Sequence, residues 1–198
     1  MDKIIPMPSE NVTDIREYKK DLRAQCKAVR SDMPPEVKIQ RDSGIFERII
    51  SSSAYKQASI ILTYVSTDIE VDTYALIQKA IQDKKRVAVP RCIDGTRDMD
   101  FYFIKDISNL EKGSFGVMEP VPAKCVKAYA FETALCIIPG LAFDMAGFFL
   151  FAHPRLVKMG ICYCACTCNE LIHGRYDIGA DYLVTEKYLR RISRERRT

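Results

Sequence analysis

The sequence predicts an α/β fold: a single domain whose helices cover both faces of a mostly parallel or mixed sheet, giving three α/β/α layers. Apolar runs rich in β-branched residues, typical of buried strands, alternate with segments of helical periodicity. The first two such runs are spaced as in a strand–helix–strand unit, whose strands are parallel. No internal repeat or long linker divides the chain. We therefore expect one domain over residues 1–198, with flexible tails at 1–12 and 187–198.

Composition narrows the class of protein. Apolar residues make up 47% of the chain and charged residues 28%, as in ordinary soluble globular proteins. The net charge of +4 fits an anionic ligand without requiring nucleic acid. We find no signal peptide and no apolar run of transmembrane length, so we expect a cytoplasmic protein without a membrane partner. In that compartment the eight cysteines are reduced thiols.

Two helices are expected at the start of the chain. From Thr13 to Met33 apolar residues recur every three or four positions, with Thr13 as the expected N-cap and prolines after the end. A second helix is expected from Pro35 to about Ser51. Beside the first apolar stripe runs a basic ridge of Arg16, Lys19, Arg23, Lys27 and Arg30. This ridge is either a solvated helix face, which composition favours, or a set of cations that reach an anionic ligand.

Strands are expected along the rest of the chain. They cover Ala58 to Ser66, Arg86 to Pro90, Asp100 to Ile104, Leu135 to Ile138, Lys158 to Thr167 and Tyr182 to Thr185. A helix capped by Asp72 or Thr73 and reaching about Gln82 joins the first two strands. Glycines and prolines predict a loop over 112–122.

Six short motifs occur in order between Lys19 and Glu186, and together they resemble one family. They are K-x-x-L-R at Lys19 to Arg23, Y-V with E-V-x-T within Tyr64 to Thr73, V-P-R at Val89 to Arg91, G-S-F-G-V-M-E-P at Gly113 to Pro120, I-P-G-L-A-F-D at Ile138 to Asp144, and Asp177 with V-T-E at Val184 to Glu186. This set resembles the 5-formyltetrahydrofolate cyclo-ligases, also called methenyltetrahydrofolate synthetases.

The resemblance implies an enzyme that uses ATP and Mg²⁺ to convert 5-formyltetrahydrofolate to 5,10-methenyltetrahydrofolate, releasing ADP and phosphate. By resemblance, Lys19 and Arg23 would contact the ATP phosphates, and Arg23 would act as the catalytic residue near the formyl oxygen. Val65 and Glu70 would bind the pterin ring, and Asp177 would bind Mg²⁺. Phosphoryl transfer depends on such positioned charges. Without the resemblance, Glu70 and Asp177 would be interpreted as surface acids.

After Gly147 the sequence departs from this family. The family continues with R-L-G-x-G-x-G-Y-Y-D, whose glycine amides approach phosphate while its arginine and aspartate add charge and bind metal. Here Phe149 and Phe151 stand at the arginine and first glycine positions, and about a dozen residues are missing before Val157. Three explanations compete: a lesion in the gene, a diverged relative of the family, and a new loop that performs the function of the missing one. The return to family-like sequence after Lys158 favours the lesion.

The departure predicts very low or no cyclo-ligase activity, because the phosphate-binding loop is absent. The alternative interpretation is a non-catalytic relative that still binds a folate or nucleotide. A third hypothesis, a nucleic-acid-binding protein, rests only on the helix ridge and on the basic segment from Lys187 to Thr198, which we interpret as a frayed tail.

Four alternating cysteines and two histidines stay outside this assignment. If Cys162, Cys164, Cys166 and Cys168 lie on one strand, the outer two are about 20 Å apart, too far to share one zinc ion. This spacing predicts packed thiols that hold no metal. His153 and His173 have no catalytic context in the sequence.

Overall fold

The computed structural model describes residues 14–96, 98–113, 116–129, 131–144, 148–149, 156–168 and 178–192. The α-helices within these ranges are α1 (Ile15–Ser31), α2 (Pro35–Ser51), α3 (Ser53–Gln57) and α4 (Tyr74–Gln82). Short 3₁₀ turns occur at Ile107–Asn109, Pro122–Lys124 and Cys164–Cys166. None of the described helices is long and apolar enough to cross a membrane.

The main sheet has eight strands in the order β14-β13-β10-β7-β1-β2-β3-β6. They are β1 (Ile60–Leu62), β2 (Arg86–Cys92), β3 (Met99–Ile104), β6 (Val126–Lys127), β7 (Ala134–Pro139), β10 (Val157–Ile161), β13 (Tyr182–Val184) and β14 (Leu189–Arg191). The central strands from β13 to β2 are parallel, and the outer pairs on both sides are antiparallel. The predicted α/β class and mixed sheet are confirmed.

Three smaller pairings lie outside the main sheet. They join β4 (Leu110–Lys112) to β5 (Met118–Pro120), β8 (Phe143–Asp144) to β11 (Thr167–Cys168), and β9 (Phe148–Phe149) to β12 (Ile178–Gly179). The β4–β5 hairpin takes up part of the expected loop over 112–122. Gly113 N closes it by donating to Val117 O at 2.8 Å.

Local signals in the sequence set most helix ends. Pro35 opens α2 at its first turn, where the missing N–H of proline costs no hydrogen bond. Of the two predicted caps of α4, Thr73 occupies the N-cap position, and Asp72 before it accepts hydrogen bonds from Tyr74 N and Ala75 N at 3.2 and 3.4 Å. At α1 the cap is Asp14, which accepts from Arg16 N at 2.7 Å, whereas the expected cap, Thr13, lies outside the described residues.

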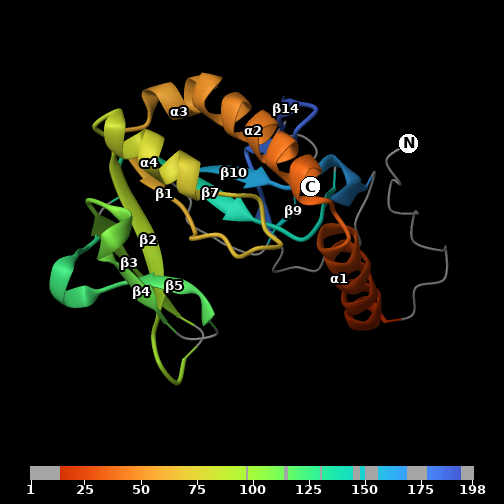
Figure 1. Cartoon of the computed structure of the whole chain (residues 1–198), viewed down its shortest axis with the longest axis horizontal. Coiled ribbons are helices and arrows are strands. Elements are labelled where there is room, and N and C mark those ends of the chain that lie inside the picture. Colours follow the sequence, from red (N-terminus) through yellow and green to blue (C-terminus); the bar gives the residue numbers. More distant parts are fainter. Residues whose placement is uncertain are drawn as a thin grey trace.

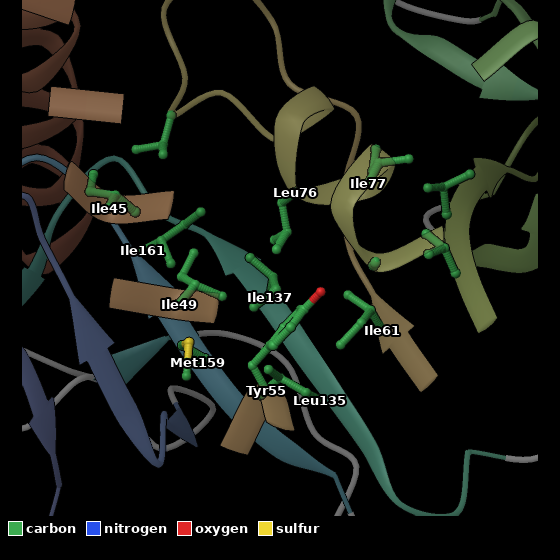
Figure 2. Close-up of a cluster of buried hydrophobic side chains, with 14 of the residues drawn as sticks. Ile45, Ile49, Tyr55, Ile61, Leu76, Ile77, Leu135, Ile137, Met159 and Ile161 are labelled. Carbon is green, nitrogen blue, oxygen red and sulfur yellow. The ribbon is translucent and has the colours of Figure 1, made fainter. Parts of the chain in front are cut away.

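Helices α2, α3 and α4 cover one face of the sheet (Figure 1). Their apolar side chains meet those of the central strands in the helix-side cluster (Figure 2). The labelled members are Ile45 and Ile49 of α2, Tyr55 of α3, Leu76 and Ile77 of α4, and Ile61, Leu135, Ile137, Met159 and Ile161 of the strands. Burial on both faces explains why β1 and β7 are continuous apolar runs.

The opposite face carries a second cluster that contains no residue of an α-helix within the described ranges. Its buried members come from strands and loops and include Leu62, Ala88, Cys136, Ile138, Phe143 and Leu183. The expected second helical layer is therefore not seen in the part of the chain that the structure describes. Between β7 and β10, where a parallel connection usually carries a helix, the described residues form β8 and β9.

The predicted strand from Lys158 to Thr167 is wrong in its second half. Strand β10 ends at Ile161, and the chain then forms the 3₁₀ turn Cys164–Cys166. Cys166 N donates to Tyr163 O at 2.8 Å, and Thr167 Oγ1 donates to Cys164 O at 2.7 Å. Because these bonds replace a strand ladder, the cysteines do not share one extended face, and the 20 Å separation inferred from a strand does not apply.

Two other expected boundaries also differ from the structure. Strand β1 spans three residues, because after Leu62 the chain leaves the β7 pairing and bends toward α4. The expected tail from residue 187 begins with ordered structure: β14 pairs with β13, and Ile192, whose backbone N–H donates to Asp181 O, is 5% exposed. An apolar side chain inside a basic segment explains this pairing.

Candidate active site

The candidate site lies where the parallel strands end. Carboxyl ends of parallel strands meet at one edge of a sheet, and ligands of α/β proteins bind there. Residues 63–73 leave this edge after β1, residues 140–142 after β7, and residues 162–168 after β10. Helix α1 lies at the same edge, apart from α2, α3 and α4 (Figure 1). Its Leu22 and Cys26 pack against Leu141, Ala142 and Cys166.

The predicted ATP-contacting cations lie on α1. Lys19 and Arg23 are four residues apart and therefore share one side of the helix. Arg23 is exposed and Lys19 is partly buried. Because Leu22 anchors α1 at the carboxyl edge, both cations are held at that edge.

Arg30, a member of the predicted basic ridge, points into the protein and is 5% exposed. Its Nη2 donates to the carbonyl oxygens of Gly140 and Leu141, the latter at 3.0 Å, and Nη1 donates to Ile69 O at 3.5 Å. Its Nε has no hydrogen-bond partner among the described residues. The interpretation of the ridge as a solvated face is wrong for this residue. Arg30 lies four residues after buried Cys26, so helical spacing already placed it on the inward stripe.

Glu70 lies in a turn that its own side chain stabilises. Its Oε2 accepts hydrogen bonds from Thr67 N and Thr67 Oγ1, both at 2.9 Å. Tyr64 OH donates to Val71 O at 3.0 Å, which ties the turn back to the end of β1. Burial, and secondly the Glu70 carboxylate, raise the pKa of Tyr64 well above its ordinary value. The carboxylate is therefore held at the carboxyl edge next to an un-ionised tyrosine.

Val65 lies in the helix-side cluster and is 3% exposed. Its neighbours Thr63 and Tyr64 instead line an apolar cavity of about 140 Å³ at the ends of β1, β2 and β7. The other lining residues include Pro90, Phe101, Ile138 and Pro139. Pockets for whole small molecules measure about 300–1,000 Å³, so this cavity has room for one part of a ligand. Tyr64 is a site residue that the motif pointed to without assigning it a role.

Two buried thiols connect α1 to the turn after β10. Cys26 and Cys166 are both fully buried, in one cluster. The hydrogen bond from Cys26, and after it the nearby Arg30 guanidinium, lower the pKa of Cys166, whereas the same hydrogen bond raises the pKa of Cys26. The two thiols and Arg30 therefore lie together where α1 meets the turn after β10.

The structure brings α1 and the Glu70 turn to one edge, but several expected site residues lie outside its described part. Asp177 and Phe151 are among them. The backbone of Phe149 pairs with Ile178, the residue after Asp177. Within the described ranges, no three His, Cys, Asp or Glu side chains come together to hold a metal ion. The predicted Mg²⁺ ligand and the absence of metal at the cysteines therefore stay predictions.

This fold defines an α/β protein whose candidate ligand site lies at the carboxyl ends of parallel strands. The model of the 5-formyltetrahydrofolate cyclo-ligase family matches residues 15–150. A probable 5-formyltetrahydrofolate cyclo-ligase of Caenorhabditis elegans is 31% identical over 139 residues, which cover 67% of each chain. The chain belongs to the 5-formyltetrahydrofolate cyclo-ligase family, as its motifs predicted.

Two further comparisons support this placement. A mitochondrial 5-formyltetrahydrofolate cyclo-ligase of Arabidopsis thaliana is 25% identical over 152 residues; the match covers 70% of this chain and 55% of that relative, so it spans about half of the plant protein. The NMR structure of Aquifex aeolicus 5,10-methenyltetrahydrofolate synthetase superposes with a TM-score of 0.73 at 24% identity, covering 88% of this chain and 92% of the other. At that identity the superposition shows a shared fold.

Proposed function

We propose that the protein binds 5-formyltetrahydrofolate at the carboxyl edge and acts as a 5-formyltetrahydrofolate cyclo-ligase with strongly reduced turnover. In this reaction the formyl oxygen attacks the γ-phosphorus of ATP and ADP leaves. The neighbouring folate nitrogen then attacks the carbon of the resulting iminophosphate, and phosphate leaves, carrying the formyl oxygen with it. The observation that carries the proposal is the convergence of the α1 cations and the Glu70 turn on one edge, joined by Arg30.

For the folate, the proposed contacts are Glu70 and the wall formed by Tyr64 and Val65. A carboxylate accepts hydrogen bonds, and the pterin ring offers N–H groups that can donate them. The apolar cavity beside Tyr64 has room for one ring, and Val65 supports this wall from within the core. The two hydrogen bonds from Thr67 orient Glu70 before any ligand arrives, which lowers the entropic cost of binding.

For ATP, the proposed contacts are Lys19 and Arg23, with Arg23 also stabilising the formyl oxygen as it takes up phosphate. Positioned cations are the main requirement of phosphoryl transfer. Asp177 is the proposed ligand of Mg²⁺, which would neutralise phosphate charge when bound. Since the described carboxylates form no metal site, we derive no step through the ion. A cytoplasmic location belongs to the same proposal.

Reduced turnover follows from the sequence between Gly147 and Val157. Phe148, Phe149 and Phe151 offer no side-chain donors to phosphate oxygens. Loss of one preorganised donor commonly lowers turnover about a hundred- to a thousand-fold. If turnover is lost completely, the protein is the alternative that we proposed, a non-catalytic member of the family that binds a folate or nucleotide.

Titration calorimetry and a turnover assay test the proposal together. We expect the purified protein to bind 5-formyltetrahydrofolate, and Glu70→Gln to weaken binding roughly tenfold or more, since hydrogen bonds to a charged group contribute about 1.5–3 kcal/mol. Glu47→Gln, on the exposed side of α2, is the matched control and should bind normally. Absence of folate binding, or equal affinity of both variants, contradicts the proposal.

Turnover is then followed by methenyltetrahydrofolate absorbance with ATP and Mg²⁺. We expect a rate far below that of the Caenorhabditis elegans relative, restored by grafting R-L-G-x-G-x-G-Y-Y-D and the following helix between Gly147 and Val157. Full turnover of the unmodified chain contradicts the assigned impairment.

A further inference from the structure

Tyr163, at the end of β10, contacts the segment that carries Glu70. Its side chain is fully buried. The single proton of its hydroxyl is shared between Asp42 Oδ1 of α2, at 2.7 Å, and the Glu70 backbone oxygen, at 3.3 Å, in a three-centre hydrogen bond. The hydroxyl thus joins α2, β10 and the turn after β1 at one point inside the protein.

Arg30 holds the neighbouring residue of the same turn. Its Nη1 donates to Ile69 O at 3.5 Å, while Nη2 donates to the carbonyl oxygens of Gly140 and Leu141. Its guanidinium carbon lies 5.6 Å from the centroid of the Tyr163 ring, within the range of a cation–π interaction. The consecutive carbonyl groups of Ile69 and Glu70 are therefore held by two residues that also contact each other.

We propose that Tyr163 and Arg30 are positioning residues that fix the Glu70 turn and thereby determine the affinity for 5-formyltetrahydrofolate. This inference rests on the proposed function, in which Glu70 meets the pterin ring. The Glu70 carboxylate is bound to Thr67 within the turn, so it moves with the turn as one unit. Displacements near 1 Å are enough to weaken a positioned contact severely.

Tyr163 and Arg30 fix the orientation of the Glu70 turn in addition to filling space. An apolar core can hold a turn at many rotations, whereas a hydrogen bond requires a narrow range of donor angles. The planar guanidinium of an arginine can donate to several carbonyl groups at once in a fixed geometry. The ammonium group of a lysine cannot. Both residues contact the backbone of the Glu70 turn, so the role that we assign to them is indirect and acts through Glu70.

Tyr163→Phe tests this inference with an unusually close control, Tyr55→Phe. Tyr55 is also buried, and its hydroxyl donates to Asp83 Oδ2 at 2.9 Å. Each aspartate is also bound by a lysine four residues earlier: Lys38 at 2.7 Å from Asp42, and Lys79 at 2.5 Å from Asp83. Neither substitution therefore leaves a carboxylate without a partner. The control pair lies at the amino ends of β1 and β2, away from the site.

We expect both variants to lower the melting temperature similarly, but only Tyr163→Phe to weaken 5-formyltetrahydrofolate binding in calorimetry, by about tenfold. Its affinity for ATP should stay unchanged. In the Glu70→Gln background, Tyr163→Phe should have no further effect on folate affinity, because residues that act through one another are not additive. Arg30→Lys provides a second variant: it should weaken folate binding, whereas Lys85→Arg should leave folate binding unchanged.

The possible outcomes separate failure of this inference from failure of the proposed function. If the unmodified protein binds folate and Glu70→Gln weakens binding, equal affinities of Tyr163→Phe and Tyr55→Phe overturn the inference alone. A full additional loss from Tyr163→Phe in the Glu70→Gln background also overturns it, because the residue then acts independently of Glu70. If the unmodified protein binds no folate, the proposed function fails and the inference fails with it.

Discussion

At each end of the sheet, a buried tyrosine donates to an aspartate and a cation lies over its ring. At the carboxyl edge these residues are Tyr163, Asp42 and Arg30; at the amino edge they are Tyr55, Asp83 and Lys85, whose Nζ lies 4.8 Å from the ring centroid. Both cations also donate to backbone carbonyl groups. The chemistry is nearly the same, but the connections differ.

The difference lies in which segments each cation joins. Lys85 donates to Ala58 O at 2.6 Å and to Lys56 O at 3.5 Å, both at the end of α3. Arg30 instead joins α1 to the segments after β1 and β7 and contacts the ring after β10. The same set of side chains stabilises one local corner at the amino edge and assembles the candidate site at the carboxyl edge.

The largest contrast is expected when each cation is replaced by methionine. Arg30→Met removes several hydrogen bonds of a buried guanidinium and should lower the free energy of unfolding by about 3–5 kcal/mol. Lys85→Met, on a more accessible side chain, should cost about 1 kcal/mol. Urea denaturation of both variants measures the difference, and equal losses would show that Arg30 is no more than a local contact.

A smaller effect, shared by the two tyrosines, is expected at alkaline pH. Burial, and secondly the bound aspartate, raise the pKa of Tyr55 and of Tyr163 above the ordinary value. The unfolded chain therefore releases these protons first, so each tyrosine stabilises the fold below pH about 10 and loses that contribution as the pH rises toward its folded pKa. Tyr55→Phe and Tyr163→Phe should each flatten the alkaline decline of the melting temperature. A decline unchanged by both substitutions contradicts this assignment.

The smallest effect concerns Asp83 in acid. Hydrogen bonds from Lys79 and Tyr55 lower the pKa of Asp83 below its ordinary value. A lowered pKa contributes stability above the unfolded value near pH 4, and the contribution is lost as the pH falls through the folded pKa. The loss of stability between pH about 5 and 2 should therefore be shallower in Asp83→Asn than in the unmodified protein. An identical acid profile would show that the amino-edge pair carries no electrostatic stabilisation.

Sequence patterns predicted elements where a local cause sets them. The bounds of α2 agree with the prediction because Pro35 fixes its start, and the β1–α4–β2 unit has the predicted parallel strands. Sequence patterns gave wrong predictions where a residue is buried by contacts from several elements. Cys162 and Cys166 are apolar and buried but do not belong to one strand. The alternation of cysteines in the sequence therefore resembled the pattern of a strand.

The candidate site was predictable only in part. Motifs located Glu70 and the α1 cations, because these belong to short, ordered signatures. The role of Arg30 was missed: helical spacing placed it on the inward stripe, but the charge of an arginine favours a solvated position and its partners lie in distant segments. Tyr163 had no signal at all: its hydroxyl contacts come from α2 and from the turn after β1, which no local pattern reveals.

Arg30 and Tyr163 also determine when the site can form as the chain is synthesised. Tyr55 and Asp83 are 28 residues apart, so the amino-edge set of Tyr55, Asp83 and Lys85 can form once the chain has been made as far as Lys85. Tyr163 lies 121 residues from Asp42, and Arg30 lies 110 residues from Gly140. Contacts of such high sequence separation form slowly, and domains are made from their N-terminus onward. The apolar stripe of α1 therefore has no partners until residues 141–166 have been made, and the carboxyl edge is assembled late in synthesis.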